Sequence, residues 1–291
     1  MTGIAVVVMA YGSPERLEDV PAYYADIRGG RPIEEQRLAE LVERYRRLGI
    51  EERSPLNAIT EQTRAALEQA LDVPVFTGMK HWRPRIDDAV ERAIETGAET
   101  VVGVVLAPHY SPLSIGGYEQ QFVGALADRA NLAFVERWGS DRRFVDLIAD
   151  RIRGTAAHVV FTAHSLPVEG SGDYREELLE TSRLVAEHAD VDDWSFSFQS
   201  ESPTGVSWLG PDILDHLDAL ASEGVRDVLA CPIGFVADHL EIRWDLDVEA
   251  ADRARALGLE FRRIEMPNAE TTFIEVLAGL VQQAVSLPSR V

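Results

Sequence analysis

Eight short apolar runs rich in β-branched and aromatic residues alternate along this chain with longer stretches in which apolar residues recur every three to four positions. The short runs predict β-strands, and the longer stretches predict amphipathic helices. Strands that alternate with helices form mainly parallel sheets with helices on both faces, so the sequence predicts an α/β protein. The expected strands are Ile4–Met9, Val75–Met79, Thr100–Leu106, Ala133–Glu136, Ala157–Ala163, Trp194–Phe198, Asp227–Cys231 and Glu260–Ile264.

Two of the helical stretches begin with a proline. Pro84 and Pro211 suit the first turn of a helix, where the missing N–H of proline has no partner to lose. The expected helices include Ile59–Leu71, Pro84–Ile94, Phe144–Ile152, Asp173–His188, Pro211–Ala221 and Thr271–Val285.

The eight expected strands fall into two groups of four, which predicts two similar doubly wound domains joined near residues 153–156. A short repeat supports this division, because Met9–Pro14 reads MAYGSP and Thr162–Pro167 reads TAHSLP. The expected domains are residues 1–153 and 154–266, with residues 267–291 packing back on the first domain.

Charge and cysteine content exclude several partners and cofactors. The formal net charge of −21 repels phosphates and anionic lipid, so we expect no nucleic-acid partner. The only cysteine, Cys231, excludes an internal disulfide and any four-cysteine zinc or iron–sulfur site. No apolar run approaches the roughly 20 residues of a membrane span, and Ile4–Met9 lacks the length and the basic flank of a signal peptide. We therefore expect a cytoplasmic protein that is not an integral membrane protein.

Polar residues gather where the expected strands end, which is where open parallel sheets bind ligands. Tyr11 follows the first strand, and His164 follows the first strand of the second group. If the repeated phrases are equivalent, these two residues face each other from the two domains. The sequence has no G-x-G-x-x-G fingerprint after the first strand, no phosphate-binding Walker loop and no G-x-S-x-G elbow, which argues against a dinucleotide site and a serine hydrolase.

An acidic ridge follows the third strand of the second group. If the chain is helical from about Asp238, then Glu241, Asp245 and Glu249 lie on one face of that helix. The ridge is either a solvated helix face or a path for a hydrated divalent cation. A histidine and a carboxylate that converge from two strand ends suit ferrous iron or zinc, held loosely enough to be passed on.

Basic charge is almost all arginine, and it is concentrated between Arg28 and Arg53. Six glutamates lie between Arg31 and Arg53, so much of this stretch is expected to be a solvated helix surface with paired charges. Arginine also suits two-pronged recognition of carboxylates, which makes the stretch a candidate carboxylate-binding edge.

Several of these phrases resemble signatures of the ferrochelatase family. Phe161–Pro167 (FTAHSLP) resembles its histidine motif, and Gly234–Glu241 (GFVADHLE) resembles its glutamate motif. The resemblance runs from residue 4 to about residue 283 and includes Met9–Pro14, Lys80-His81 and Leu106–His109. It implies two Rossmann-like domains with a porphyrin in the cleft between them, and no tightly bound cofactor.

The same resemblance implies roles for individual residues. His164 and Glu241 match the catalytic and metal-site residues, and Asp245 and Glu249 match a path for entering metal. Tyr11 matches the axial residue of the coproporphyrin III-using enzymes. The residues that match porphyrin contacts are Arg28, Arg44, Tyr45, Ser54 and Tyr118.

One departure from the family pattern concerns its paired arginines, which read Arg28-Gly29 here. A contact to a porphyrin propionate is therefore absent or is supplied by Arg31. Some relatives carry a [2Fe-2S] cluster, which the single cysteine excludes.

The expected reaction is the insertion of Fe²⁺ into coproporphyrin III by a monomer whose partners are the porphyrin and ferrous iron. The cleft would bend the ring, and His164 would take a pyrrole proton or coordinate iron with help from Glu241. Three alternatives stay open: a protoporphyrin IX ferrochelatase, a cobalt or sirohydrochlorin chelatase, and a porphyrin or haem carrier without activity. The acidic ridge argues against the carrier, which needs no path for metal.

Overall fold

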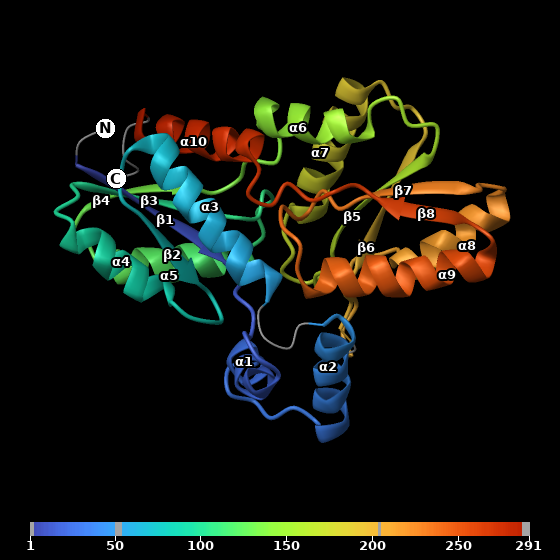
Figure 1. Ribbon diagram of the computed structural model, residues 1–291, viewed down its shortest axis with the longest axis horizontal. Helices are drawn as coiled ribbons and strands as arrows, with labels where there is room; N and C mark the ends of the chain where they lie inside the picture. Colours follow the sequence, from blue (N-terminus) through green and yellow to red (C-terminus); the bar gives the residue numbers. More distant parts are fainter. Residues whose placement is uncertain (1–2, 50–53, 203–204, 287–291) are drawn as a thin grey trace.

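The computed structural model of the chain describes residues 3–49, 54–202 and 205–286. Within these residues the strands form two four-stranded sheets, and every pairing is parallel. The order is β2-β1-β3-β4 in one sheet and β6-β5-β7-β8 in the other, so the two sheets share one topology. Figure 1 shows them side by side with helices on their faces, which confirms the predicted α/β class. The strands are β1 (Ile4–Ala10), β2 (Val75–Met79), β3 (Thr100–Val105), β4 (Asn131–Val135), β5 (His158–His164), β6 (Trp194–Gln199), β7 (Asp227–Cys231) and β8 (Glu260–Arg263).

The central strands are apolar throughout because helices cover both faces of each sheet. All seven residues of β1 are buried, and so are the five central residues of β5. None of the helices within the described ranges is both long and apolar enough to cross a membrane. The helices are η1 (Leu17–Asp19), α1 (Val20–Ile27), α2 (Glu35–Arg47), α3 (Pro55–Leu71), α4 (Ile86–Glu95), α5 (Ile115–Leu126), α6 (Arg142–Ile152), α7 (Tyr174–Ala189), α8 (Ile213–Glu223), η2 (Ile242–Ala250), α9 (Ala251–Leu257) and α10 (Thr271–Ser286).

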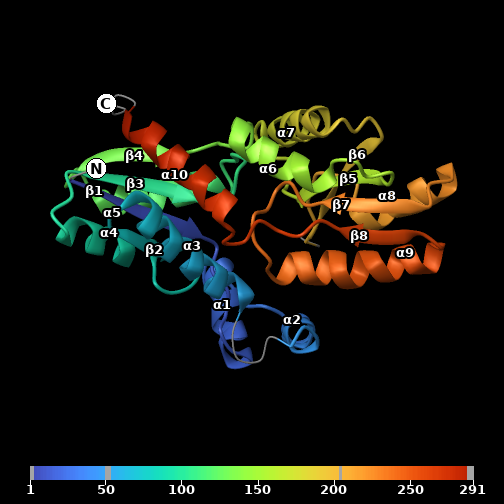
Figure 2. The same ribbon diagram turned by 45° about the horizontal axis from the view of Figure 1, so that its top comes forward.

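The last helix, α10, packs on α3, α6 and the strands β3 and β4 (red in Figures 1 and 2). Phe273, Leu277 and Val281 recur every four residues and are fully buried, so one apolar face fixes the helix there. Residues 287–291 of the segment that we expected to pack on the first domain lie outside the described residues. The domain boundaries at residues 153 and 266 stay a prediction.

The two prolines that we placed in first helical turns lie instead two residues before α4 and α8, and the peptide bond before each is cis. The carbonyl oxygens of Pro84 and Pro211 accept hydrogen bonds from the N–H groups of Met79 and Phe198, at 2.7 and 2.8 Å. Each proline therefore continues the hydrogen bonding of a strand end, and its helix begins later than predicted.

A helical excursion formed by α1 and α2 leaves the first sheet after β1 and projects from it (Figures 1 and 2). Val20 and Tyr45 are buried there among apolar side chains that include Leu240, which comes from the second half of the chain. The excursion thus joins the two halves beside the segment that carries Glu241.

Candidate active site

The two residues expected to face each other follow equivalent strands. His164 is the last residue of β5, and Tyr11 comes directly after β1. β1 and β5 have the same second place in their sheets. The carboxyl ends of both strands therefore deliver an aromatic side chain to the region between the sheets.

His164 and Glu241 lie together. The Nε2 atom of His164 is 3.4 Å from Oε1 of Glu241. A second imidazole, His239, places its Nε2 3.6 Å from Oε2 of the same carboxylate. One carboxylate thus lies between two imidazoles, one from the end of β5 and the other from the loop before the helix of Glu241.

The backbone fixes which nitrogen of each imidazole faces Glu241. Nδ1 of His164 is hydrogen-bonded to the carbonyl oxygen of Ser165, and Nδ1 of His239 is bonded to that of Ala237 at 2.8 Å. Because a carbonyl only accepts, each Nδ1 carries a proton. A neutral imidazole then turns a lone pair toward the carboxylate, and this contact favours a cation, either a proton or a metal ion, between the two.

The positive charge of His164 and the negative charge of Glu241 stabilise each other. Burial by itself lowers the pKa of His164, but the carboxylate of Glu241 outweighs it and raises that pKa to about 9. Burial acts to raise the pKa of Glu241, but the imidazoles of His164 and His239 hold it well below its usual range. The side chains of His164 and Glu241 are 32% and 35% exposed, so protein surrounds them while one side stays open to solvent.

The helix that carries the acidic ridge differs from the prediction. It starts at Leu240, not at Asp238, and residues 242–250 form a π-helix. Asp238 instead belongs to the preceding loop, where its N–H donates to the side-chain oxygen of Asn268 at 2.8 Å and its carboxylate accepts from Arg263 at 2.9 Å. A π-helix has a wider turn than an α-helix, so side chains four residues apart stand more nearly in line, and such segments are frequent at functional sites.

The ridge is not a uniformly solvated face. Asp245 is only 7% exposed and accepts hydrogen bonds from Ser200 and, at 3.5 Å, from Gln199. Burial and then the charge of Glu241 raise the pKa of Asp245 to about 7, against the hydrogen bond from Ser200. Glu249 lies further along, half-exposed and 3.5 Å from Arg44 of α2. The row therefore has a buried carboxyl, that of Asp245, between two partly exposed carboxylates, those of Glu241 and Glu249.

Tyr11 lies close enough to Glu241 for the two to interact electrostatically, and its place on the opposite side of a ring stays a prediction. It is 41% exposed, and its ring contacts His81 with a centroid distance of 4.6 Å. Desolvation and then the negative charge of Glu241 raise the pKa of Tyr11 well above its usual value.

The residues expected to contact a porphyrin differ in accessibility. Tyr45, Ser54 and Tyr118 are 2%, 3% and 4% exposed. Arg28 and Arg44 are more accessible: Nε of Arg28 donates to backbone oxygens of its own loop, and the guanidinium of Arg44 lies 5.2 Å from the ring centre of Trp244. Arg53 of the arginine-rich stretch lies outside the described residues. As porphyrin contacts, all of the expected residues stay predictions.

Three groups at this site were assigned no role from the sequence. His239, Ser200 and Trp244 contact Glu241, Asp245 and Arg44, respectively. His239 lies in the glutamate motif and is two residues from Glu241, which was an available signal. The contact between Ser200 and Asp245 joins residues 45 positions apart, and no local pattern indicates it.

Solved structures share this architecture. The cobalt complex of the sirohydrochlorin chelatase SirB from Bacillus subtilis subspecies spizizenii superposes with a TM-score of 0.63 over 99% of this chain and 97% of that chain, at 11% identity. The two-sheet fold is therefore one that metal chelatases adopt.

The sequence comparisons define the family. A ferrochelatase family model matches residues 3–285. A ferrochelatase from Herpetosiphon aurantiacus is 40% identical, over 95% of this chain and 97% of its own length. A coproporphyrin III ferrochelatase from Halalkalibacterium halodurans is 36% identical, over 97% of each chain. The chain belongs to the ferrochelatase family, so it is a metal chelatase of the lyase class that acts in haem synthesis by inserting iron.

The raised pKa of Asp245 predicts that this side chain destabilises the fold of the metal-free protein as the pH rises. The folded-state pKa of about 7 lies above the ordinary value of 3.8. The protonated carboxyl therefore stabilises the fold at low pH, and this contribution is lost as the pH rises through about 7. We expect Asp245→Asn to be more stable than the wild type by about 4 kcal/mol at pH 8 but by only about 2 kcal/mol at pH 5, at about 1.4 kcal/mol per pKa unit, because the folded protein still holds the proton at the lower pH.

Thermal unfolding of chelator-treated protein at the two pH values measures this difference. Asp252→Asn is the control, because that carboxylate is exposed on α9. A stability gain from Asp245→Asn that is equal at pH 5 and pH 8 would contradict the pKa assignment.

Proposed function

We propose that this protein inserts Fe²⁺ into coproporphyrin III, with His164 and Glu241 as the metal-binding and catalytic pair. The contact between Nε2 of His164 and Oε1 of Glu241, 3.4 Å long, carries the proposal. It offers one nitrogen and one carboxylate ligand, a set that suits ferrous iron and binds it too loosely for a permanent site.

The reaction exchanges one metal ion for two pyrrole protons, and the pair can serve both sides of this exchange. Fe²⁺ displaces the proton that His164 holds beside the Glu241 carboxylate in the metal-free protein. When the ion passes into the ring, both bases are free to accept the pyrrole protons. Tyr11 approaches the ring from the other face, and Asp245 and Glu249 lead hydrated metal toward Glu241.

The surroundings of the site favour a substrate with many carboxylates. Coproporphyrin carries four propionates and protoporphyrin carries two. Arg28, Arg31 and Arg44 lie on the excursion formed by α1, α2 and the loop between them, which borders the segment of Glu241. Several relatives that share more than a third of their residues with this chain are named coproporphyrin III ferrochelatases, while others are named only ferrochelatases.

Steady-state rates with the two porphyrins test the substrate. Under anaerobic conditions with Fe²⁺, we expect kcat/KM for coproporphyrin III to exceed that for protoporphyrin IX by at least about tenfold, equivalent to about 1.4 kcal/mol. Equal rates, or a preference for protoporphyrin IX, would contradict the substrate assignment. A free-base absorption spectrum that persists after iron is added would indicate a carrier.

Arg44 provides a separate test of carboxylate recognition. Arg44→Gln removes a charge that binds a propionate as proposed, so we expect KM for coproporphyrin III to rise about tenfold, while kcat changes less than about twofold. Arg46→Gln is the matched control, because Arg46 is on the same helix and pairs with Glu43 on the surface. An Arg44→Gln variant that behaves like the control in titrations of coproporphyrin would remove Arg44 from the binding site.

We also propose that the enzyme acts in the cytoplasm, that it is a monomer and that it has no tightly bound cofactor. The net charge of −21 supports a molecule that stays away from anionic lipid and nucleic acid. Cys231 is buried in β7, and one cysteine cannot ligate an iron–sulfur cluster by itself. Sedimentation equilibrium and metal analysis of the purified protein test the second and third statements.

A further inference from the structure

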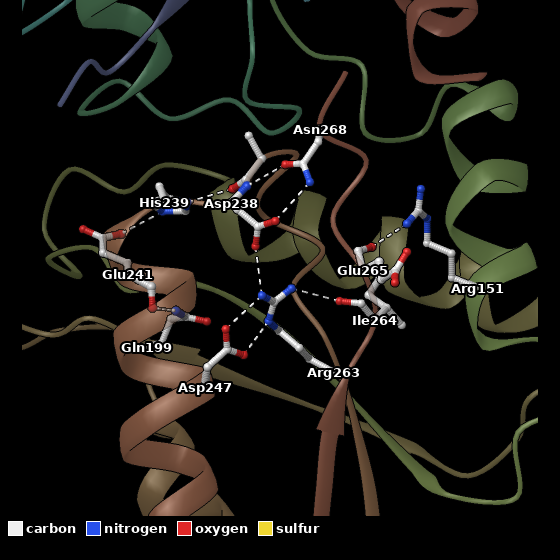
Figure 3. A network of polar contacts seen from close by, with 11 residues as sticks. Arg151, Gln199, Asp238, His239, Glu241, Asp247, Arg263, Ile264, Glu265 and Asn268 are labelled. Atoms are coloured by element: carbon white, nitrogen blue, oxygen red, sulfur yellow. Dashed lines mark hydrogen bonds and ion pairs between the residues drawn. The ribbon is translucent and has the colours of Figure 1, made fainter. Parts of the chain in front are cut away.

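A single guanidinium, that of Arg263 at the end of β8, ties together the two segments that flank Glu241 (Figure 3). Nε and Nη2 of Arg263 donate to the carboxylate of Asp247 at 2.7 and 2.9 Å. Nη2 also donates to Asp238 at 2.9 Å, and Nη1 donates to the carbonyl oxygen of Ile264 at 3.1 Å. Asp238 comes three residues before Glu241, and Asp247 comes six residues after it. The Arg263 side chain therefore binds one residue on each side of Glu241.

Asn268 completes this arrangement on the side of Asp238. Its Nδ2 donates to the Asp238 carboxylate at 3.0 Å, and its Oδ1 accepts the Asp238 N–H at 2.8 Å. Its own N–H donates to the carbonyl oxygen of Val236 at 2.8 Å. Asn268 has a φ of 51°, in the left-handed region that asparagine tolerates better than most residues. This conformation turns both its side chain and its N–H toward the loop that carries His239.

The hydrogen bonds of Arg263 hold the two carboxylates that it binds in defined positions. Its side chain is 16% exposed, and all three of its nitrogens are engaged. A two-pronged arginine–carboxylate pair is directional as well as strong. The oxygens of Glu241 lie 3.4 and 3.6 Å from two imidazole nitrogens. Because nitrogen and oxygen ligands bind such metals at about 2.0–2.2 Å, a shift of about 1 Å would separate the ligands from a shared ion.

We propose that Arg263 is a positioning residue for metal transfer. Through the two carboxylates that it binds, it sets the distance of Glu241 from His164 and His239. The inference rests on the proposed role of His164 and Glu241. A lysine cannot take its place, because an ammonium group lacks the planar fork that binds two carboxylates in fixed directions.

Kinetics of Arg263→Gln and Asn268→Ala test this role. We expect kcat for Fe²⁺ or Zn²⁺ insertion to fall at least about tenfold and the KM for metal to rise, as is typical when the support of a metal ligand is removed. The Kd for porphyrin, measured by fluorescence quenching, should stay within about twofold, and Arg263→Lys should not restore kcat. The matched control is Arg253→Gln, which removes another two-pronged pair, with bonds of 2.7 and 2.6 Å to Asp218, between α9 and α8.

The inference is overturned if Arg263→Gln and Arg253→Gln have equal kcat and metal KM at a temperature where circular dichroism shows both folded. A purely structural support would give that result, with a lower melting temperature as the sole effect. If Arg263→Gln does not fold, Arg263→Lys decides, because it keeps the positive charge but lacks the planar fork, and wild-type kinetics in that variant would also overturn the inference. Inactivity of the wild-type protein would contradict the proposed function instead.

Discussion

Replacing Glu241 with glutamine is expected to lower the rate of iron insertion by about a thousandfold, within the range typical for loss of a positioned acid–base group. Glutamine keeps the shape of the side chain, but it cannot accept a pyrrole proton and is a weak ligand for iron. It also cannot balance the charge of His164, whose imidazole lies 3.4 Å away. Because Glu241 is not expected to contact the porphyrin carboxylates, affinity for coproporphyrin III should change by less than about twofold.

Single-turnover absorption spectra measure the insertion rate, and fluorescence quenching measures porphyrin affinity. Glu260→Gln is the control, since Glu260 is an exposed glutamate on β8. Turnover by Glu241→Gln within about threefold of the wild-type rate would refute the assignment of Glu241 as ligand and base, because such a group contributes far more than that.

Replacing His164 with alanine is expected to cost at least about a hundredfold in the same rate. The variant loses the nitrogen ligand and one of the two proton acceptors. It also removes the largest of the influences that lower the pKa of Glu241, so that pKa should rise. A pH–rate profile of the remaining activity should therefore shift its acid limb to higher pH.

A variant with both His164 and Glu241 replaced shows whether these two residues act together or independently. If His164 and Glu241 act as one unit, the double variant loses about as much activity as the more severe single variant, because effects within a unit are strongly non-additive. His188→Ala is a matched control, since His188 forms another histidine–carboxylate contact, 2.7 Å from Asp146. Strictly multiplicative losses for His164 and Glu241 would contradict a shared metal ion.

Most of the fold could be predicted because its determinants are local. Valine-rich runs such as β1 are buried on both faces, and their spacing with amphipathic helices allows few arrangements other than parallel sheets. The starts of α4 and α8 were mispredicted because Pro84 and Pro211 use their carbonyl groups in contacts with neighbouring strand ends. Such contacts depend on the tertiary structure and leave no local pattern.

The site could be predicted only where strand ends and motifs marked it. His164 and Glu241 come together as the sequence suggested, since His164 ends β5 and Glu241 lies in the segment after its neighbouring strand β7. The loop conformation of Asp238 before this helix was not predictable, because the residues that bind Asp238 are Asn268 and Arg263. These partners lie 25 to 30 residues along the chain, and only folding shows that they meet.

A crystal structure of the protein with iron coproporphyrin III tests the central claim most directly. The account predicts a ring between the two sheets, with the Tyr11 oxygen toward the iron on one face and His164 and Glu241 on the other. A ring bound elsewhere, or an iron with Tyr11 and His164 on the same face, would contradict it.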